Sequence, residues 1–509
     1  MIPKSIIILG GGSTGLLAAT YIKKYLPDAG WKISVIASSK IPIIGVGEGT
    51  TEHIDYWRKT VGITHGEFAT ETLGTEKYGV RFLDWRYDGH EYIHGLSSEV
   101  SLLHNPDLQS QYQFFNDRNL HWSMTEKEIM YGLCAYQENQ LLSSPSYMEH
   151  KRGQVRLGST SLQYHFNNFA LNKFLRKLCN KFDIEIIDDE IVDLTFNENG
   201  TVKSLNSSSE KYEADFFFDC SGFKRFIISK MGATFKDYGD QLILDSALFF
   251  PDETEDVYIP YTLAQGMKSG WFWQAPTQDR TGNGYVFSSS HITADQALME
   301  LEQKFGKTIK PAGVHKFKSG HLDKSWIKNV CALGISSGFF EPLEAAAIST
   351  GVLQANLFCE LITSYNSSDN FAQNYYNKKM KEVYDNSFEF IRLHYLNCRE
   401  DTPFWKDYKN LKMPDELSEK IEMWKHRPPS EAEFPYRGFL LYGPYNFFQV
   451  MYGLDLCNSE SLMNWFKYKG KEKNIFDTLI LYDNYLNRVN DEVKITTKEK
   501  LEIYRKNVE

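Results

Sequence analysis

The sequence predicts an α/β fold over residues 1–350, followed by a mostly helical region over residues 351–509. Two observations lead to this prediction. An apolar, β-branched run at residues 5–9 passes through a glycine-rich turn into a helical stretch at residues 16–22, and strands and helices then alternate until about residue 350. Later on, helical stretches dominate, at residues 345–365, 371–395, 417–426 and 475–489. Residues 100–160 are polar, aromatic and irregular, which indicates an insertion.

The first turn has the spacing Gly-x-Gly-x-x-Gly, in which Gly10, Gly12 and Gly15 surround Ser13 and Thr14. Between a strand and a helix, this spacing is typical of dinucleotide-binding domains. The first glycine allows a tight turn, the second lets a pyrophosphate approach the backbone, and the third lets the helix pack closely on the strand. The N-terminus of the helix would face the anion. We therefore expect a dinucleotide here, with a plain strand-to-helix turn as the alternative.

The second strand, at residues 31–36, ends without the acidic residue that usually binds the adenosine ribose. Ala37, Ser38 and Ser39 stand there instead, and the Ser38 hydroxyl is a weaker replacement for the carboxylate. This position therefore does not distinguish FAD from NAD.

Composition narrows the class of protein. The net charge of −10 argues against nonspecific binding to nucleic acid or to an anionic membrane. No apolar run approaches the ~20 residues of a membrane span, and a strand begins too early for a signal peptide. The seven cysteines are scattered without a C-x-x-C pair, which indicates reduced thiols and a cytoplasmic location.

Three further segments carry unusual residues. Gly45, Val46 and Gly47 form a compact strap that can approach a ligand closely. Lys77 stands beside an extended apolar stretch, although a lone lysine is usually a solvated surface residue. Trp271 and Trp273 have strand spacing, which places both indoles on one face, either as core residues or as the wall of a ligand site.

In combination, these segments resemble the flavin-dependent tryptophan halogenase family. The family has the same glycine turn, an I-G-V-G-E-x-T strap, a lysine in K-[FY]-G and a central W-x-W-x-I-P, from which this chain departs at Ala275. The resemblance runs from the first strand to about residue 455. Other matching segments are Tyr164–Asn167, Phe217–Phe223, Ala332–Glu344 and Tyr384–Trp405.

The resemblance implies an FAD-binding, Rossmann-like box domain with mixed sheets and a helical region that binds the substrate. Residues implied to bind FAD are Gly10, Gly12, Ser13, Thr14, Gly15, Ser38, Gly45, Val46, Gly47, Val192, Ile335 and Ile348.

The implied chemistry uses reduced FAD (FADH2), O2 and a halide ion. A separate NAD(P)H flavin reductase supplies the reduced FAD, and the halide is oxidised to hypohalous acid, which moves through a tunnel to an aromatic substrate. By resemblance, Lys77 holds or accepts the halogen, either as a neutral amine that forms a haloamine or as a charged donor to hypohalous acid. Glu344 matches the essential carboxylate, which orients the oxidant or takes the arene proton. An ionised Glu344 would favour the charged lysine. Without the resemblance, Glu344 is simply an acidic residue at a helix N-terminus.

The chain departs from the family just after Glu344, where Ala345, Ala346 and Ala347 replace a Ser-[TS]-Gly sequence. The family's halide lies on backbone N–H groups at the positions of Ala346 and Ala347, so halide binding survives the change. Because a hydroxyl is lost and the surroundings become more apolar, we expect bromide or iodide to be used at least as well as chloride.

The substrate-binding residues implied by resemblance are His94, Phe447 and Phe448. A tryptophan that the family has near Phe447 is absent, and no groups match those that would clamp an amino acid. A phenol, another indole or a carrier-bound aromatic unit is therefore expected at least as strongly as free tryptophan. No metal site is expected.

Two other classes of protein stay open. A flavin monooxygenase would hydroxylate an aromatic substrate, but it has no reason to carry both the tryptophan pair and Lys77. A non-catalytic flavin-binding scaffold has no reason to retain Lys77 and Glu344. The sequence has a single nucleotide-binding fingerprint and no second one for NADPH, which fits dependence on a partner reductase. The oligomeric state stays open, with a homo-oligomer as one alternative.

Overall fold

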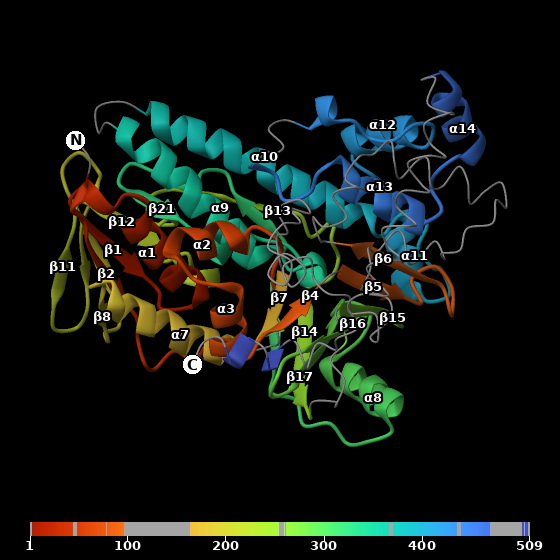
Figure 1. The fold of residues 1–509 in the computed structure, drawn as a ribbon, viewed down its shortest axis with the longest axis horizontal. Coiled ribbons are helices and arrows are strands. Elements are labelled where there is room, and N and C mark those ends of the chain that lie inside the picture. Colours follow the sequence, from red (N-terminus) through yellow and green to blue (C-terminus); the bar gives the residue numbers. More distant parts are fainter. Residues whose placement is uncertain are drawn as a thin grey trace.

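A computed structural model describes residues 3–43, 48–77, 79–95, 163–253, 259, 261–365, 370–434, 439–468, 501–502 and 504–506. The expected insertion at residues 100–160 and the expected helix at residues 475–489 lie outside this set. A mostly parallel sheet occupies one end of the molecule, a larger mixed sheet lies beside it, and a helical region extends beyond both (Figure 1).

The first sheet has six strands in the order β20-β21-β12-β1-β2-β8. All neighbours pair in parallel except β20 and β21. The central strands are apolar and almost fully buried, as expected for a parallel sheet that is covered on both faces. The strands are β1 (Ser5–Leu9), β2 (Lys32–Ile36), β8 (Glu185–Ile187), β12 (Phe216–Asp219), β20 (Trp326–Ile327) and β21 (Val330–Ala332).

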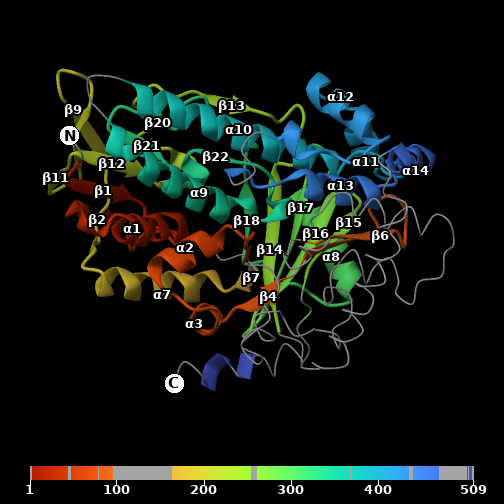
Figure 2. The same ribbon diagram turned by 45° about the horizontal axis from the view of Figure 1, so that its top comes forward.

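Helix α1 (Ser13–Tyr25) directly follows β1, so the expected strand, turn and helix are confirmed. It contacts α2 (Ile54–Val61), α7 (Asn168–Lys181) and α9 (Ala346–Leu361). Helix α10 (Phe371–Leu393) contacts α9 in turn, and both lie on the same side of α1 (Figure 2).

The second sheet has seven strands in the order β18-β14-β17-β16-β15-β5-β6. Trp271 and Trp273 on β16 face one side, where they join the main core, whereas Phe272 faces the other side and packs with α8 (Ala294–Phe305). The expectation that both indoles share one face is therefore confirmed. The strands are β5 (Gly79–Leu83), β6 (Glu91–Gly95), β14 (Ser246–Asp252), β15 (Thr262–Met267), β16 (Gly270–Pro276), β17 (Thr281–Phe287) and β18 (Gly313–Lys316).

Three small sheets complete the strands of the described residues. The sheet β3-β7-β4 brings Lys77 on β4 beside Gly49 on β3 through their shared partner β7. The strands are β3 (Glu48–Gly49), β4 (Thr75–Lys77) and β7 (Gln163–Phe166), then β9 (Asp193–Phe196), β10 (Val202–Asn206) and β11 (Lys211–Glu213), then β13 (Phe235–Asp237), β19 (Gly320–Leu322) and β22 (Gly338–Phe339).

The helical expectation for the last third of the chain agrees with the described residues. Helices α9, α10 and α12 (Asp415–Trp424) match the expected stretches at residues 345–365, 371–395 and 417–426. The remaining helices are α3 (His65–Glu71), α11 (Pro403–Asn410), α13 (Pro444–Gly453) and α14 (Ser459–Tyr468), and the 3-10 turns include η6 (Gly334–Ser336) and η7 (Pro342–Glu344). The boundary expected near residue 350 is not a structural break, because α9 crosses it.

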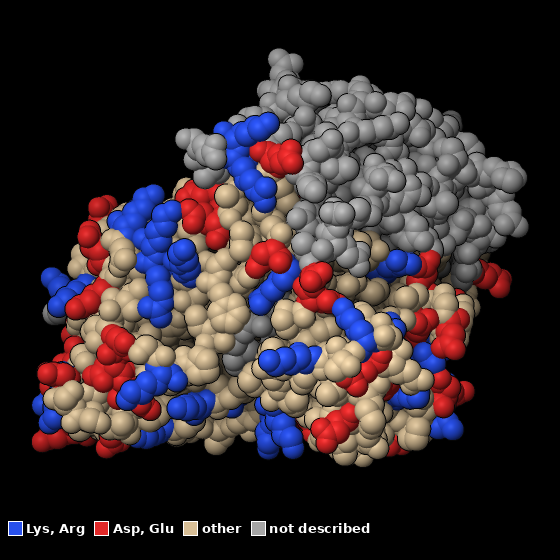
Figure 3. Space-filling view, turned by 90° about the horizontal axis from the view of Figure 1, so that it is seen from below, with Lys and Arg blue, Asp and Glu red and all other residues tan. Residues whose placement is uncertain are grey.

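The segment Ala346–Ser364 is long and apolar enough to span a membrane by length and composition, but two thirds of it (67%) is buried inside the fold. It is the helix that packs between α1 and α10. On the described part of the face drawn in Figure 3, acidic and basic side chains are interspersed.

Candidate active site

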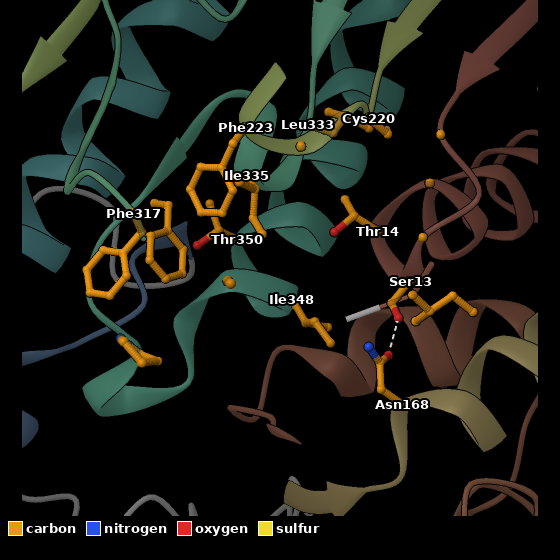
Figure 4. A pocket seen from close by; sticks show the side chains of 18 of the residues that line it. Ser13, Thr14, Asn168, Cys220, Phe223, Phe317, Leu333, Ile335, Ile348 and Thr350 are labelled. Carbon is orange, nitrogen blue, oxygen red and sulfur yellow. Dashed lines mark hydrogen bonds between the residues drawn. The ribbon is translucent and has the colours of Figure 1, made fainter. Parts of the chain in front are cut away.

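A cavity of about 610 Å³ opens where β1, β2 and β12 end and reaches across to the wall formed by β16. Ligand sites in α/β folds lie at this edge of a parallel sheet, and the volume is in the usual range for a cofactor pocket. Figure 4 shows Ser13, Thr14, Ile335, Ile348 and Thr350 arranged around it, with Ser13 hydrogen-bonded to Asn168.

The glycine turn fits a dinucleotide. Gly10 has φ +125°, and a Cβ on Gly15 would lie 2.0 Å from the carbonyl oxygen of Gly10, so neither position accepts a side chain. By contrast, a Cβ on Gly12 would meet no atom within 4 Å, which means that the space over this residue is open. Gly12 is also the N-cap of α1 and lacks any side-chain cap, so the first N–H groups of the helix are available to an anion.

Most of the residues expected to bind FAD lie around this cavity. Those that line it are Gly10, Gly12, Ser13, Thr14, Gly15, Ser38, Ile335 and Ile348. Val192 does not line it: its side chain is 54% exposed, and the preceding residues Asp189, Glu190 and Ile191 line the cavity instead. A contact of Val192 with the cofactor therefore stays a prediction. Gly45, Val46 and Gly47 lie outside the described residues.

Trp271 and Trp273 form one wall of the cavity, with ring centroids 6.2 Å apart. Their position is fixed by close packing, because a Cβ on Gly284 of the neighbouring strand would lie 1.9 Å from the Trp273 ring. The wall is therefore rigid and apolar. On α11, the Trp405 indole donates a hydrogen bond to the carbonyl oxygen of Met267 on β15.

Lys77 lies at the inner end of the cavity and is 1% exposed. Its ammonium donates to the carbonyl oxygen of Thr50 at 3.3 Å, and a Cβ on Gly49 would lie 3.2 Å from Nζ and 3.5 Å from Cβ of Ala345. Burial lowers the pKa of Lys77 from 10.5 to about 8, and the charge of Glu344 opposes this shift. The amine therefore stays mostly protonated at neutral pH but can lose its proton at a modest free-energy cost.

Glu344, on the turn η7, is fully buried and lies between two histidines. His94 Nδ1 lies 3.0 Å from Oε2, and His394 Nε2 lies 3.0 Å from Oε1. Burial alone would raise the pKa of this carboxyl, but His94 and His394 lower it to about 2. Glu344 is therefore a carboxylate at every physiological pH, and it provides the charge that favours protonated Lys77.

The outer ring nitrogens of both histidines are also engaged. Asn446 Nδ2 donates to His94 Nε2 at 2.9 Å, and the Tyr92 hydroxyl lies 2.9 Å from His394 Nδ1. With the outer nitrogens engaged in this way, His94 Nδ1 and His394 Nε2 are the ring nitrogens that face Glu344. Burial lowers the pKa of His394, which agrees with a neutral ring.

We expected His94 beside an aromatic substrate. Both of its ring nitrogens are engaged within the protein, one by Glu344 and one by Asn446. Phe447 is fully buried against Phe390, Trp424 and Phe434, and Phe448 is 1% exposed. Neither phenylalanine lines the described cavity, so a direct contact of these three residues with substrate stays a prediction.

Ala346 and Ala347 begin α9 and, like Lys77, line the cavity. Ala345 precedes them with φ 55°, in the left-handed region that L-residues other than glycine and asparagine rarely adopt. The turn exposes the first N–H groups of α9, because the N-cap has no side-chain hydrogen bond. Among the described residues, no cluster of His, Cys, Asp or Glu could hold a metal ion.

Sequence reasoning did not assign roles to His394, Asn446, Tyr92 and Glu341. The tyrosine and His394 stand inside segments that match the family, but nothing local marks them as partners of Glu344. They come together only because β6, α10 and α13 meet at the turn η7.

Comparisons with known proteins agree with this geometry. The sequence profile described as tryptophan halogenase matches residues 5–464. Tryptophan 7-halogenase RebH of Lentzea aerocolonigenes is 30% identical over 450 residues, 82% of this chain and 81% of RebH. The 7-chloro-L-tryptophan 6-halogenase KtzR of Kutzneria sp. (strain 744) is 28% identical over 88% of this chain and 90% of KtzR. Among solved structures, BrvH, a flavin-dependent halogenase from Brevundimonas sp. BAL3, has a TM-score of 0.82 at 25% identity and covers 99% of both chains.

Proposed function

Because the chain belongs to the tryptophan halogenase family, whose flavin-dependent members use reduced FAD, O2 and halide, we propose that it halogenates an aromatic substrate through hypohalous acid relayed by Lys77. One observation carries this proposal: the buried ammonium of Lys77 lies at the inner end of a cofactor cavity and interacts with an ionised, doubly clamped Glu344. Neither group has a reason to be buried in a protein that only binds a dinucleotide.

The residues around the cavity fit FAD. The open space over Gly12 and the uncapped N-terminus of α1 would hold the pyrophosphate, and Ser38 stands where the ribose is bound in this fold. The tryptophan wall excludes water from one side of the cavity. When bound, the reduced cofactor would supply two electrons to O2, and the activated oxygen would oxidise halide to hypohalous acid.

Lys77 and Glu344 act in the steps that follow the formation of hypohalous acid, and each has a separate role. With its pKa near 8, Lys77 acts as a charged hydrogen-bond donor that holds and polarises hypohalous acid, in preference to forming a haloamine. Glu344 fixes the lysine charge and accepts the proton that leaves the arene, and His94 and His394 keep its carboxylate in the ionised form that can accept this proton. The arene gains the halogen, and its proton and the hydroxide of hypohalous acid leave together as water.

Halide binding on the N–H groups of Ala346 and Ala347 extends the proposal to the choice of halide. Three consecutive alanines at the start of α9 make the surroundings apolar, so a larger, less hydrated anion loses less hydration there. We expect bromide or iodide to compete at least equally with chloride. A wide preference for chloride in a mixed-halide competition would refute this part.

The substrate, partner and location complete the proposal. A phenol, a non-tryptophan indole or a carrier-bound aromatic unit is favoured, because no amino-acid clamp is recognised in the sequence. Reduced FAD comes from a separate NAD(P)H-dependent reductase, and the protein acts in the cytoplasm.

The test uses purified protein with FAD, NADH, a flavin reductase and a panel of phenols, indoles and anilines. Chloride, bromide and iodide are supplied separately, and products are identified by mass. A halide-specific mass gain that vanishes in Lys77→Ala but persists in Lys318→Ala, a change of a 75% exposed lysine, would support the proposal. A gain of one oxygen that is indifferent to halide would instead indicate a monooxygenase.

A further inference from the structure

The turn that carries Glu344 carries a second buried carboxyl. Glu341 precedes η7, is 3% exposed and lines the cavity together with Trp271 and Pro342. It is therefore next to the space in which the oxidant forms, whereas Glu344 does not line this cavity. The proposed function assigns no role to Glu341.

The neighbours of Glu341 come from three elements. Tyr395 on α10 donates its hydroxyl to Oε1, and the Trp271 indole on β16 and the Tyr408 hydroxyl on α11 also interact with the carboxyl. Arg392 on α10 contributes a positive charge, and Lys77 lines the same cavity. Among the described residues, Oε2 of Glu341 is buried and has no hydrogen-bond partner, so one oxygen of the carboxyl is available to carry a proton.

Glu341 and Glu344 have opposite protonation states. Burial raises the pKa of Glu341 to about 8, although Tyr395, Trp271 and Arg392 act to lower it. The pKa of Glu344 is about 2 because His94 and His394 stabilise its charge. At neutral pH the turn therefore presents one neutral carboxyl at the cavity and one carboxylate to the histidines.

The oxidation of halide consumes a proton. In balanced form, FADH2, O2, X⁻ and H⁺ give FAD, HOX and H2O. The competing reaction, in which FADH2 and O2 give FAD and H2O2, consumes none. A buried site that makes hypohalous acid therefore needs a proton donor at the cavity, and a site without one would release peroxide.

Resting on the proposed function, we propose that Glu341 is this donor: its carboxyl O–H bond breaks as halide is oxidised, the proton enters the products, and solvent later reprotonates the carboxylate. The other acidic residues lining the cavity in the described part are Asp189 and Glu190, which follow β8 near Ser38 and are accessible to solvent. Lys77 already has a proposed role, which is to bind hypohalous acid. Of the acidic residues that line the described cavity, Glu341 is therefore the buried one.

A purely structural role would make Glu341 the counter-ion of Arg392, which is 1% exposed. The isosteric change Glu341→Gln distinguishes the two roles, because it keeps the shape and a hydrogen-bond acceptor but cannot release a proton. The holoenzyme is supplied with reduced FAD, O2 and bromide, and a reagent that traps hypohalous acid and an assay for peroxide are read together.

We expect Glu341→Gln to lower the ratio of hypohalous acid to peroxide by about 100-fold, the lower range of general-acid effects. Glu341→Asp, which keeps a carboxyl, should recover part of the ratio. In the wild type the ratio should fall as pH rises through about 8, and this fall should persist in Lys77→Met and vanish in Glu341→Gln. An unchanged ratio, or a fall that vanishes in Lys77→Met only, would overturn the inference.

A second measurement does not depend on turnover. The infrared carbonyl band of a protonated carboxylic acid should be present in the cofactor-free wild type, disappear above about pH 8 and be missing in Glu341→Gln. Its absence from the wild type at neutral pH would refute a stored proton. If the wild-type protein forms no hypohalous acid, the proposed function itself is refuted. If Glu341→Gln forms as much hypohalous acid as the wild type, only the role of Glu341 is refuted.

Discussion

Replacing His394 by phenylalanine tests how the charge on Glu344 is maintained. The change keeps a planar ring but removes the Nε2–H that lies 3.0 Å from Oε1, so His94 alone would hold the carboxylate. The pKa of Glu344 falls from 4.5 to about 2 in the folded protein. At ~1.4 kcal/mol for each pKa unit, the two histidines together add on the order of 3 kcal/mol to the free energy of unfolding at neutral pH.

The direction of the pKa shift of Glu344 determines how its contribution to stability changes with pH. Because the folded pKa lies below the unfolded one, this contribution is present above pH 4.5 and is lost as the pH falls toward 2. We expect His394→Phe to lower the free energy of unfolding at neutral pH by about 1.5–3 kcal/mol, the usual range for a hydrogen bond to a charged group. His394→Gln, whose amide can take the place of Nε2, should recover more than His394→Asn.

The assay is a double-mutant cycle with Glu344→Gln, read as the urea midpoint of the cofactor-free protein at neutral pH. If His394 acts through the carboxylate, its replacement should have a much smaller effect when Glu344 is already neutral. Halogenation should fall in His394→Phe while hypohalous acid is still formed. An equal loss of stability in the wild-type and the Glu344→Gln protein would show that His394 serves only as a packing residue. It would refute the idea that His394 stabilises the charge on Glu344.

Three further changes have expected outcomes. Lys77→Met should abolish halogen transfer to the arene but raise the free energy of unfolding at pH 7, measured by urea unfolding, by up to about 3 kcal/mol. The reason is that the lysine pKa is lowered from 10.5 to about 8, so its buried charge destabilises the fold below pH 8. This gain in stability should shrink as the pH rises from 8 toward 10.5, and a pH-independent gain would contradict the prediction. Gly12→Ala should keep the wild-type melting temperature and weaken FAD binding, measured by flavin fluorescence, because its Cβ meets no protein atom, whereas Gly15→Ala should lower the melting temperature as well; equal melting temperatures for the two variants would contradict the packing argument. Gly284→Ala should displace Trp273 and expose its indole, measured as a red shift of tryptophan fluorescence, and an unshifted spectrum would show that the wall tolerates the methyl group.

The sequence was sufficient for features that depend on local spacing. The Gly-x-Gly-x-x-Gly turn predicted β1, the bend and α1, because Gly10 has a positive φ and Gly15 packs against the carbonyl oxygen of Gly10, whereas Gly12 leaves open space for a ligand. The alternation Trp271-Phe272-Trp273 correctly gave the two faces of β16. Helices α9, α10 and α12 followed from long uninterrupted stretches.

Features that depend on contacts between distant segments could not be predicted. His94 and Glu344 are 250 positions apart and Glu344 and His394 are 50 apart, and no spacing rule connects a strand, a 3-10 turn and a helix end. For Phe447, an aromatic-rich segment does not reveal whether its rings stack on a ligand or on Phe390 and Trp424. The missing information in both cases is the tertiary packing.

The short turn from Glu341 to Glu344 has a consequence for the engineering of this protein. Only two residues, Pro342 and Leu343, lie between the carboxyl proposed to help make the oxidant and the carboxyl proposed to help use it. The two carboxyls have different partners: Tyr395 and Trp271 for Glu341, His94 and His394 for Glu344. On the predicted substrate contacts of β6 and α13, we expect mutations in these elements to change the substrate range while oxidant production is inherited unchanged. Libraries aimed at new arenes should keep residues 341–347 constant, because a change there would alter both steps at once and disguise a loss of oxidant as a change of specificity.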